Sequence, residues 1–197
     1  MSSSSGQGSG QTDAIDALDR AVQKRFHNVI GFGMARIATE KKFVPETEEE
    51  KQAVDALKKS GLRVGLYLAG RLVLEPKPTD AQWGQYGFGR TVSRPLFFGS
   101  KTKPDEVPTQ LALWEQTREA LLAFMRGKDV YDFKVGEWSV RARPVRASDN
   151  SCLRCHSQDY RIVYLPKGIS GYKVKGDNNL QVGDPVGVLL YAYSQLR

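Results

Sequence analysis

Five consecutive residues, 152–156, combine the side chains of this chain that are best suited to chemistry. They read Cys-Leu-Arg-Cys-His and contain both cysteines and one of the two histidines of the 197-residue sequence. Two thiols separated by two residues can each form a thioether with a porphyrin vinyl group, while the next imidazole turns back beneath the iron. The pattern therefore predicts one covalently attached haem c, held by Cys152 and Cys155, with His156 as the proximal iron ligand.

Three other uses of the two cysteines fit the sequence less well. A thioredoxin-like dithiol site would follow a strand in a β-α-β pattern, which the sequence does not predict. A structural zinc site would need every cysteine and histidine of the chain, two of them adjacent in sequence. A disulfide between cysteines three residues apart would close too short a loop to stabilise the fold much.

The sixth iron ligand is left open by the sequence. His27 is the remaining histidine, and on a helix it shares a face with Met34, seven residues later. We take His27 as the candidate distal ligand and Met34 as the alternative, with Met125, water or an open position as further possibilities. The competing interpretation is that Met34 fills the core and that His27 is an ordinary surface residue.

Arginines and aromatic residues could complete such a site. Arg141, Arg143 and Arg146 precede the cysteine motif on a predicted strand, and one of them could pair with a haem propionate. Aromatic side chains such as Tyr67 and Trp138 could pack on the porphyrin. For both groups, the ordinary roles of surface arginine and core aromatic residue remain open alternatives.

The composition is typical of one globular domain, with 40% hydrophobic and 26% charged residues. The 29 basic and 22 acidic residues give a net charge of +7, but the basic residues are scattered among acids. We therefore expect no nucleic-acid partner, although a basic surface can dock on an acidic redox partner. Since no apolar run approaches roughly 20 residues, we also expect no membrane span.

Helices are predicted where apolar residues recur with a period near 3.6. This pattern predicts a long first helix over 13–41, a second over 46–59 and a third over 107–126, the last ended by Gly127. Asp149 and the residues after it can cap a short helical turn that carries the cysteine motif.

Strands are predicted where apolar and polar residues alternate. A hairpin is expected over 62–74, and further strands are expected over 130–135, 138–145 and 186–193. The stretch 75–104 is rich in Pro, Gly and aromatic residues, and we expect a long structured loop there.

These elements predict an α+β domain over 13–197, with a helical arm over 13–60 and the sheet and motif over 61–197. The Ser- and Gly-rich residues 1–12 are expected to be a flexible tether. They are either a cloning remnant or the spacer that follows a removed export signal, since they lack the apolar core of a signal peptide.

Beyond the pentapeptide, the last third of the chain resembles bacterial PAS-like domains that bind haem c. The matching residues are WSVRARPV at 138–145, the motif with the preceding Ser151, Gly-Tyr at 171–172, and VGDPVGV at 182–188. The resemblance implies an antiparallel PAS-like sheet with a long N-terminal helix and flanking helices. It also implies an extracytoplasmic, periplasmic location, because haem c is attached outside the bacterial inner membrane. Some members have a distal cysteine on the first helix, which this chain lacks.

Function is a separate question from fold. The leading hypothesis is a redox-sensing or diatomic-gas-sensing haem module, whose partner is a small gas ligand or a redox protein. The alternative is a soluble electron-transfer cytochrome. A haem enzyme acting on peroxide or nitrogen oxides is the least favoured, because the sequence offers few distal acid or base groups. A homodimer that pairs through the N-terminal helix is a further possibility.

Overall fold

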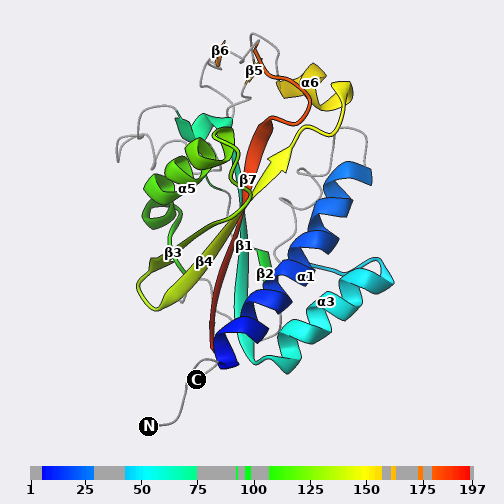
Figure 1. Cartoon of the computed structure of the whole chain (residues 1–197), viewed down its shortest axis with the longest axis vertical. Helices are drawn as coiled ribbons and strands as arrows, with labels where there is room; N and C mark the ends of the chain where they lie inside the picture. The colour runs from blue at the N-terminus through cyan, green and yellow to red at the C-terminus, as the bar shows by residue number, and fades with distance from the viewer. Residues whose placement is uncertain are drawn as a thin grey trace, which may run out of the picture.

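The computed structural model describes residues 6–28, 43–74, 92, 96–98, 107–156, 161–162, 173–174 and 179–195. These residues form an α+β fold around a five-stranded antiparallel sheet with the strand order β2-β1-β7-β4-β3 (Figure 1). The strands are β1 (Leu62–Gly70), β2 (Leu96–Phe98), β3 (Tyr131–Val135), β4 (Trp138–Arg146) and β7 (Pro185–Gln195). The short strands β5 (Arg161–Ile162) and β6 (Lys173–Val174) form a separate antiparallel pair.

Helices cover both faces of the sheet (Figure 1). On one face lie α1 (Gly6–Asn28) and α3 (Glu48–Lys59), and on the other lies α5 (Gln110–Met125). The short helix η1 (Arg71–Leu74) follows β1, and α6 (Asn150–His156) follows β4. The α+β prediction is therefore confirmed at the level of fold class.

The central strand β7 fixes the register of the sheet. It pairs with β1 over nine residues, from Leu62 opposite Gln195 to Gly70 opposite Gly187. On its other side it pairs with β4, and the register shifts between Val145 and Arg146. Since side chains alternate between the two faces of a strand, β1 and β7 each bury residues on both sides of the sheet.

This alternation produces two hydrophobic clusters. We call the first the α1 cluster, and its main members are Ile15, Leu18, Val22, Leu57, Val64, Leu66, Leu189 and Tyr191. We call the second the α5 cluster, and its main members are Tyr67, Leu113, Trp114, Leu121, Phe124, Trp138, Val188 and Leu190. The sheet thus separates two cores.

Helix α1 begins earlier than the sequence predicts. Its first residue is Gly6, so residues 6–12 are helical rather than part of a flexible tether. Burial starts at Ala14, which is why the apolar period indicated a later start. Adding residues to an existing helix costs little free energy compared with starting one, so the Ser/Gly segment continues the helix. The rest of the predicted helix, 29–41, lies outside the described residues.

Helix α3 confirms the second predicted helix and shows why it starts where it does. Thr47 is the N-cap: its side chain accepts a hydrogen bond from the Glu50 N–H, and the Glu50 side chain accepts one from the Thr47 N–H. This capping box satisfies two backbone donors at the start of the helix. Glu50 is also bound by Arg25 of α1, with Nη2 2.6 Å from Oε2, which joins the two helices.

The hairpin predicted over 62–74 is wrong. Residues 62–70 form one unbroken strand, and Arg71–Leu74 form a short helix instead of a returning strand. The partners of β1 are β2 and β7, both distant in sequence. Ala69-Gly70 suggested a turn, but these residues pair with Val188 and Gly187, and such long-range pairing overrides local turn preference.

The third predicted helix and the three predicted strands are confirmed, although the helix spans Gln110–Met125 rather than 107–126. Helix α5 ends at Met125, and Gly127 follows with a φ of 92°, a left-handed conformation that suits a residue without Cβ. Strands β3, β4 and β7 lie where alternation predicts them. Most of the loop expected over 75–104 lies outside the described residues; within that range, β2 is a strand and Val92 bridges to Ala69.

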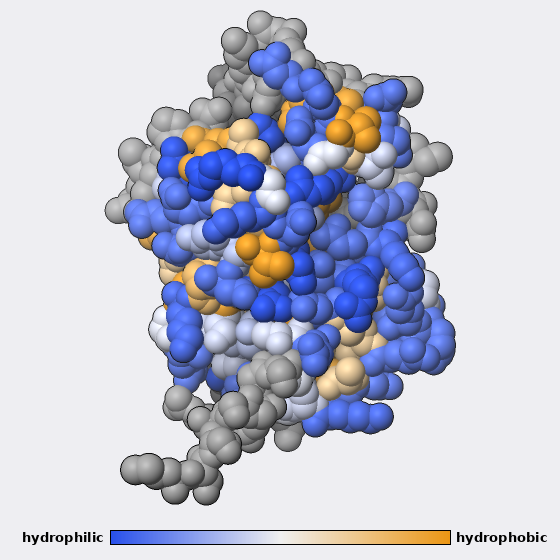
Figure 2. All heavy atoms as spheres, in the orientation of Figure 1, coloured by the Kyte–Doolittle hydropathy of each residue, from blue (hydrophilic) through white to orange (hydrophobic). Residues whose placement is uncertain are grey.

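The surface is mostly hydrophilic, with small separate hydrophobic groups on the face drawn in Figure 2. Among the residues that the structure describes, four large hydrophobic side chains are exposed, and they come from separate places in the chain: Val44, Leu111, Met125 and Val182. Among the described residues, no helix has the length and apolar character needed to cross a membrane.

Candidate functional site

Helix α6 carries the cysteine motif and begins with a side-chain cap. The Asp149 carboxylate accepts a hydrogen bond from the Ser151 N–H, with Oδ1 2.7 Å from N. Hydrogen bonds from Ser151 and its neighbours hold the pKa of Asp149 below its usual value. This confirms the capping role predicted for Asp149, and it satisfies a backbone donor in the first turn.

The helix places the three predicted haem-binding positions on one side. Cys152, Cys155 and His156 occupy positions i, i+3 and i+4 of α6, which lie together on a helical face. Cys152 is a half-buried free thiol, and its Sγ lies 3.6 Å from the Ser148 Oγ. His156 is also half-buried, while the side chain of Cys155 lies outside the described part of the structure.

The motif helix packs on the α1 side of the molecule. Cys152 and Leu153 are partly buried against the α1 cluster, which contains Ile15, Leu18 and Val22 of α1. Figure 1 shows α6 at the end of the molecule toward which the C-terminal end of α1 points. The two aromatic residues suggested as porphyrin contacts, Tyr67 and Trp138, belong instead to the α5 cluster on the other face.

The structure places two of the three candidate distal ligands. His27 is exposed in the last turn of α1, and Met125 is 48% exposed at the end of α5. Met34 lies outside the described residues. Since α1 and α6 share one hydrophobic cluster and α5 belongs to the other, His27 is on the same side of the sheet as the motif and Met125 is not.

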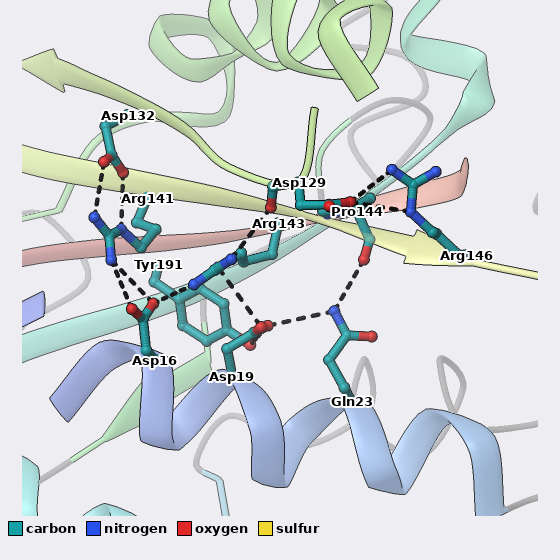
Figure 3. Close-up of polar contacts among 10 residues, drawn as sticks. All are labelled: Asp16, Asp19, Gln23, Asp129, Asp132, Arg141, Arg143, Pro144, Arg146 and Tyr191. Atoms are coloured by element: carbon teal, nitrogen blue, oxygen red, sulfur yellow. Dashed lines mark hydrogen bonds and ion pairs between the residues drawn. The ribbon is translucent and has the colours of Figure 1, made fainter. Parts of the chain in front are cut away.

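Two of the three arginines considered for a propionate already bind acids of α1 (Figure 3). Arg141 contacts both Asp16 and Asp132, with N–O distances of 2.9 Å and 2.8 Å. Arg143 Nη2 lies 2.5 Å from Asp16 Oδ1. Arg141 and Arg143 lie on the α1 face of β4, so their ion pairs with Asp16 connect α1 to the sheet.

A buried carboxyl group lies next to these ion pairs (Figure 3). Asp19 is 9% exposed and accepts a hydrogen bond from the Tyr191 hydroxyl, with the two oxygens 2.9 Å apart. Gln23 donates to Asp19 at 3.3 Å and to the Pro144 carbonyl of β4 at 2.9 Å. The Arg143 Nε lies 3.7 Å from Asp19 Oδ2 and has no hydrogen-bond partner among the described residues.

Burial and charge shift the pKa values of the two acids of α1 in opposite directions. Burial raises the pKa of Asp19 above its usual value, and the contacts with Tyr191 and Arg143 only partly offset this. Partial burial also acts to raise the pKa of Asp16, but hydrogen bonds from Arg143 and Arg141 outweigh it, so the pKa of Asp16 is lowered. Burial raises the pKa of Tyr191 well above its usual value.

The residue types at α6 fit a covalently held haem c. The positions that thioether formation and axial ligation need share one helical face, and the described thiol, that of Cys152, is free and half-buried. Within the described residues, the side chains of His, Cys, Asp and Glu form no group of three or more that could hold a metal ion.

The contacts between α1 and β4 are not apparent from the sequence. Asp16 and Asp19 are three residues apart and therefore share a helical face, beside the apolar positions 15, 18 and 22. Two acids beside the apolar face of a helix indicate that this face also makes polar contacts with a neighbouring element. Their partners lie about 125 residues later in the chain, which no local pattern reveals.

Comparison of the chain with protein-family models, with curated proteins and with solved structures found no match.

Proposed function

We propose that this chain is a covalent mono-haem c protein, with Cys152 and Cys155 as thioether donors and His156 as the proximal iron ligand. The observation that carries the proposal is the placement of these three residue types at i, i+3 and i+4 of one short, side-chain-capped helix. When bound, the haem would supply reversible one-electron chemistry and a site for diatomic gases.

Each group of the motif has its own task in this proposal. The two thiols hold the porphyrin to α6, and the cap at Asp149 keeps that helix formed. Leu153, between the cysteines, packs with Cys152 against the α1 cluster and so holds α6 on that core. His27 is the distal ligand that we favour, because it lies on the same side of the sheet as α6.

We propose redox or gas sensing as the role of this group. Cys152 and Leu153 contact the same hydrophobic cluster that buries Leu18 and Val22 of α1, so a displacement of α6 changes the packing of that helix. Close-packed interiors transmit such displacements, because their side chains have little free space.

Electron transfer is the second candidate, and the net charge of +7 favours it. An excess of basic residues accelerates association with an acidic redox partner and makes the rate depend on ionic strength. A sensor for gases needs an iron position that the gas can occupy, whereas a simple electron carrier does not.

The finer fold assignment and the location belong to the same proposal. A PAS-like assignment is supported by the antiparallel sheet, the helices on its faces and the position of the motif between β4 and β7. An extracytoplasmic location follows from covalent haem attachment, as it does in the family that the last third of the chain resembles.

The first test is the visible spectrum of the protein produced together with a haem-attachment system. We expect denatured wild type to retain one haem per chain, the variant with both Cys152→Ala and Cys155→Ala to retain none, and His156→Ala to keep the haem with altered iron ligation. Wild-type protein without covalent haem would refute the proposal.

The second test separates the two roles and identifies the distal ligand. We expect His27→Ala to convert the low-spin spectrum to high spin, while Arg20→Ala, at an exposed position seven residues earlier on the same helix, serves as the control. Binding of carbon monoxide to the reduced wild-type protein would favour gas sensing. A low-spin form that excludes carbon monoxide favours electron transfer.

A further inference from the structure

The segment that leads into α6 is held by an irregular continuation of the sheet. The regular β4–β7 register ends at Arg146, yet two more backbone hydrogen bonds follow it. The Ala147 N–H donates to the Asp184 carbonyl at 2.9 Å, and the Gly183 N–H donates to the Ala147 carbonyl at 2.8 Å. Ala147 itself is buried, with 1% of its surface exposed.

The turn that provides these bonds is closed by its own aspartate. The Asp184 carboxylate accepts a hydrogen bond from the Gln181 N–H at 2.8 Å, while the Asp184 N–H donates to the Gln181 carbonyl at 3.0 Å. Gly183 has a φ of +96°, where a side chain would cause strain. The Gly-Asp pair is therefore what allows this turn to present its backbone to Ala147.

Arg146 connects the turn to a third segment. Its guanidinium donates to the Gly183 carbonyl at 3.0 Å, to the Lys128 carbonyl at 3.0 Å and to the Asp129 carboxylate at 2.7 Å. Lys128 and Asp129 follow the end of α5. The end of β4, the turn before β7 and the turn after α5 therefore meet at Arg146, four residues before α6 begins.

We propose that Asp184 and Arg146 are positioning residues that fix the orientation of α6, and through it the position in which His156 would ligate a bound haem iron. This rests on the proposed haem-binding function. We call the group formed by Arg146, Ala147, Gln181, Gly183 and Asp184 the motif bracket. Through its backbone hydrogen bonds to Ala147, the bracket fixes the chain that enters the motif helix.

The test measures backbone amide hydrogen exchange in α6 and the reduction potential of the full-length haem-loaded protein. We expect Asp184→Ala to accelerate exchange of the α6 amides at least tenfold. We also expect it to shift the ratio of oxidised to reduced protein about tenfold at a fixed potential, or about 59 mV for one electron. Asp184→Asn keeps an acceptor oxygen for the Gln181 N–H and is expected to stay near wild type.

Glu137→Gln is the matched control, because Glu137 pairs with Arg63 at 3.2 Å and lies in the β3–β4 turn, away from α6. Asp184→Ala with α6 exchange and potential like those of Glu137→Gln would overturn the proposal. If Asp184→Ala does not fold, Arg146→Gln decides by the same two readouts. Wild type without haem would refute the proposed function, while hydrogen exchange in that protein would still test the bracket.

Discussion

Helices α1 and α5 cover opposite faces of the same sheet, but the polar groups at the two contacts differ. Under α5, the buried Tyr67 hydroxyl donates to the neutral Pro108 carbonyl at 2.6 Å, and Thr117 donates to Leu113 within its own helix. Under α1, the buried Tyr191 hydroxyl donates to the carboxyl group of Asp19 on the facing helix. Charged groups therefore cross the α1 contact, while neutral groups complete the α5 contact.

This difference in polar contacts indicates how each helix is held on the sheet. Hydrophobic contact depends on buried area and tolerates small sliding movements. Ion pairs and hydrogen bonds between Asp16, Asp19 and the arginines of β4 are directional, so they fix where α1 lies along the sheet. The motif helix packs on the cluster beneath α1, and the more strictly positioned helix is thus the one beside the candidate haem site.

The largest expected effects come from truncating one leucine in each core, and hydrogen exchange in α6 distinguishes the two variants. Leu18 in α1 and Leu121 in α5 are both 0% exposed, so replacing either by alanine is expected to lower the free energy of unfolding by about 3 kcal/mol. Leu18→Ala is also expected to accelerate hydrogen exchange in α6, and Leu121→Ala is not. Denaturant unfolding and amide exchange check this; equal acceleration in both variants would contradict the separation of the two clusters.

The two buried tyrosines provide the next comparison. Tyr191→Phe removes a donor from a buried carboxyl group, and we expect a loss of about 2 kcal/mol of unfolding free energy. Tyr67→Phe removes a donor from a backbone carbonyl, and we expect a loss of about 1 kcal/mol. Urea denaturation measures both. A larger loss for Tyr67→Phe would argue that the α1 contact is not the more polar one.

The smallest effect is a pH dependence that should differ in sign between the two acids of α1. Since burial raises the pKa of Asp19, its contribution to stability is present below the unfolded value of about 3.9 and is lost as the pH rises through the folded value. The unfolding free energy of wild type minus that of Asp19→Asn should therefore decrease as the pH rises from 4.

Asp16→Asn is the matched control for that measurement. The arginines lower the pKa of Asp16, so its contribution is present above about 3.9 and is lost as the pH falls through the folded value. Wild type minus Asp16→Asn should therefore decrease as the pH falls below 4. The same trend for both variants would show that the two carboxyl groups do not occupy different environments.

Local patterns predicted most of the elements. The acids at 46–50 marked the start of α3, Asp149 marked the cap of α6, and alternation marked β3, β4 and β7. The hairpin at 62–74 failed because the partner of Leu62 is Gln195, and sequence alternation does not reveal which distant strand supplies the hydrogen bonds. The role of Arg141 was hidden for the same reason, since Asp16 lies 125 residues away.

The position of β7 in the middle of the sheet also governs the order of assembly. Both β1 and β4 hydrogen-bond to this strand, which is the last described strand in the chain. During synthesis from the N-terminus, the pairs β1–β2 and β3–β4 must wait as separate halves until residues 185–195 emerge and join them. Such late long-range pairing favours slow folding, and the cysteines at 152 and 155 leave the ribosome before the sheet that supports them can close.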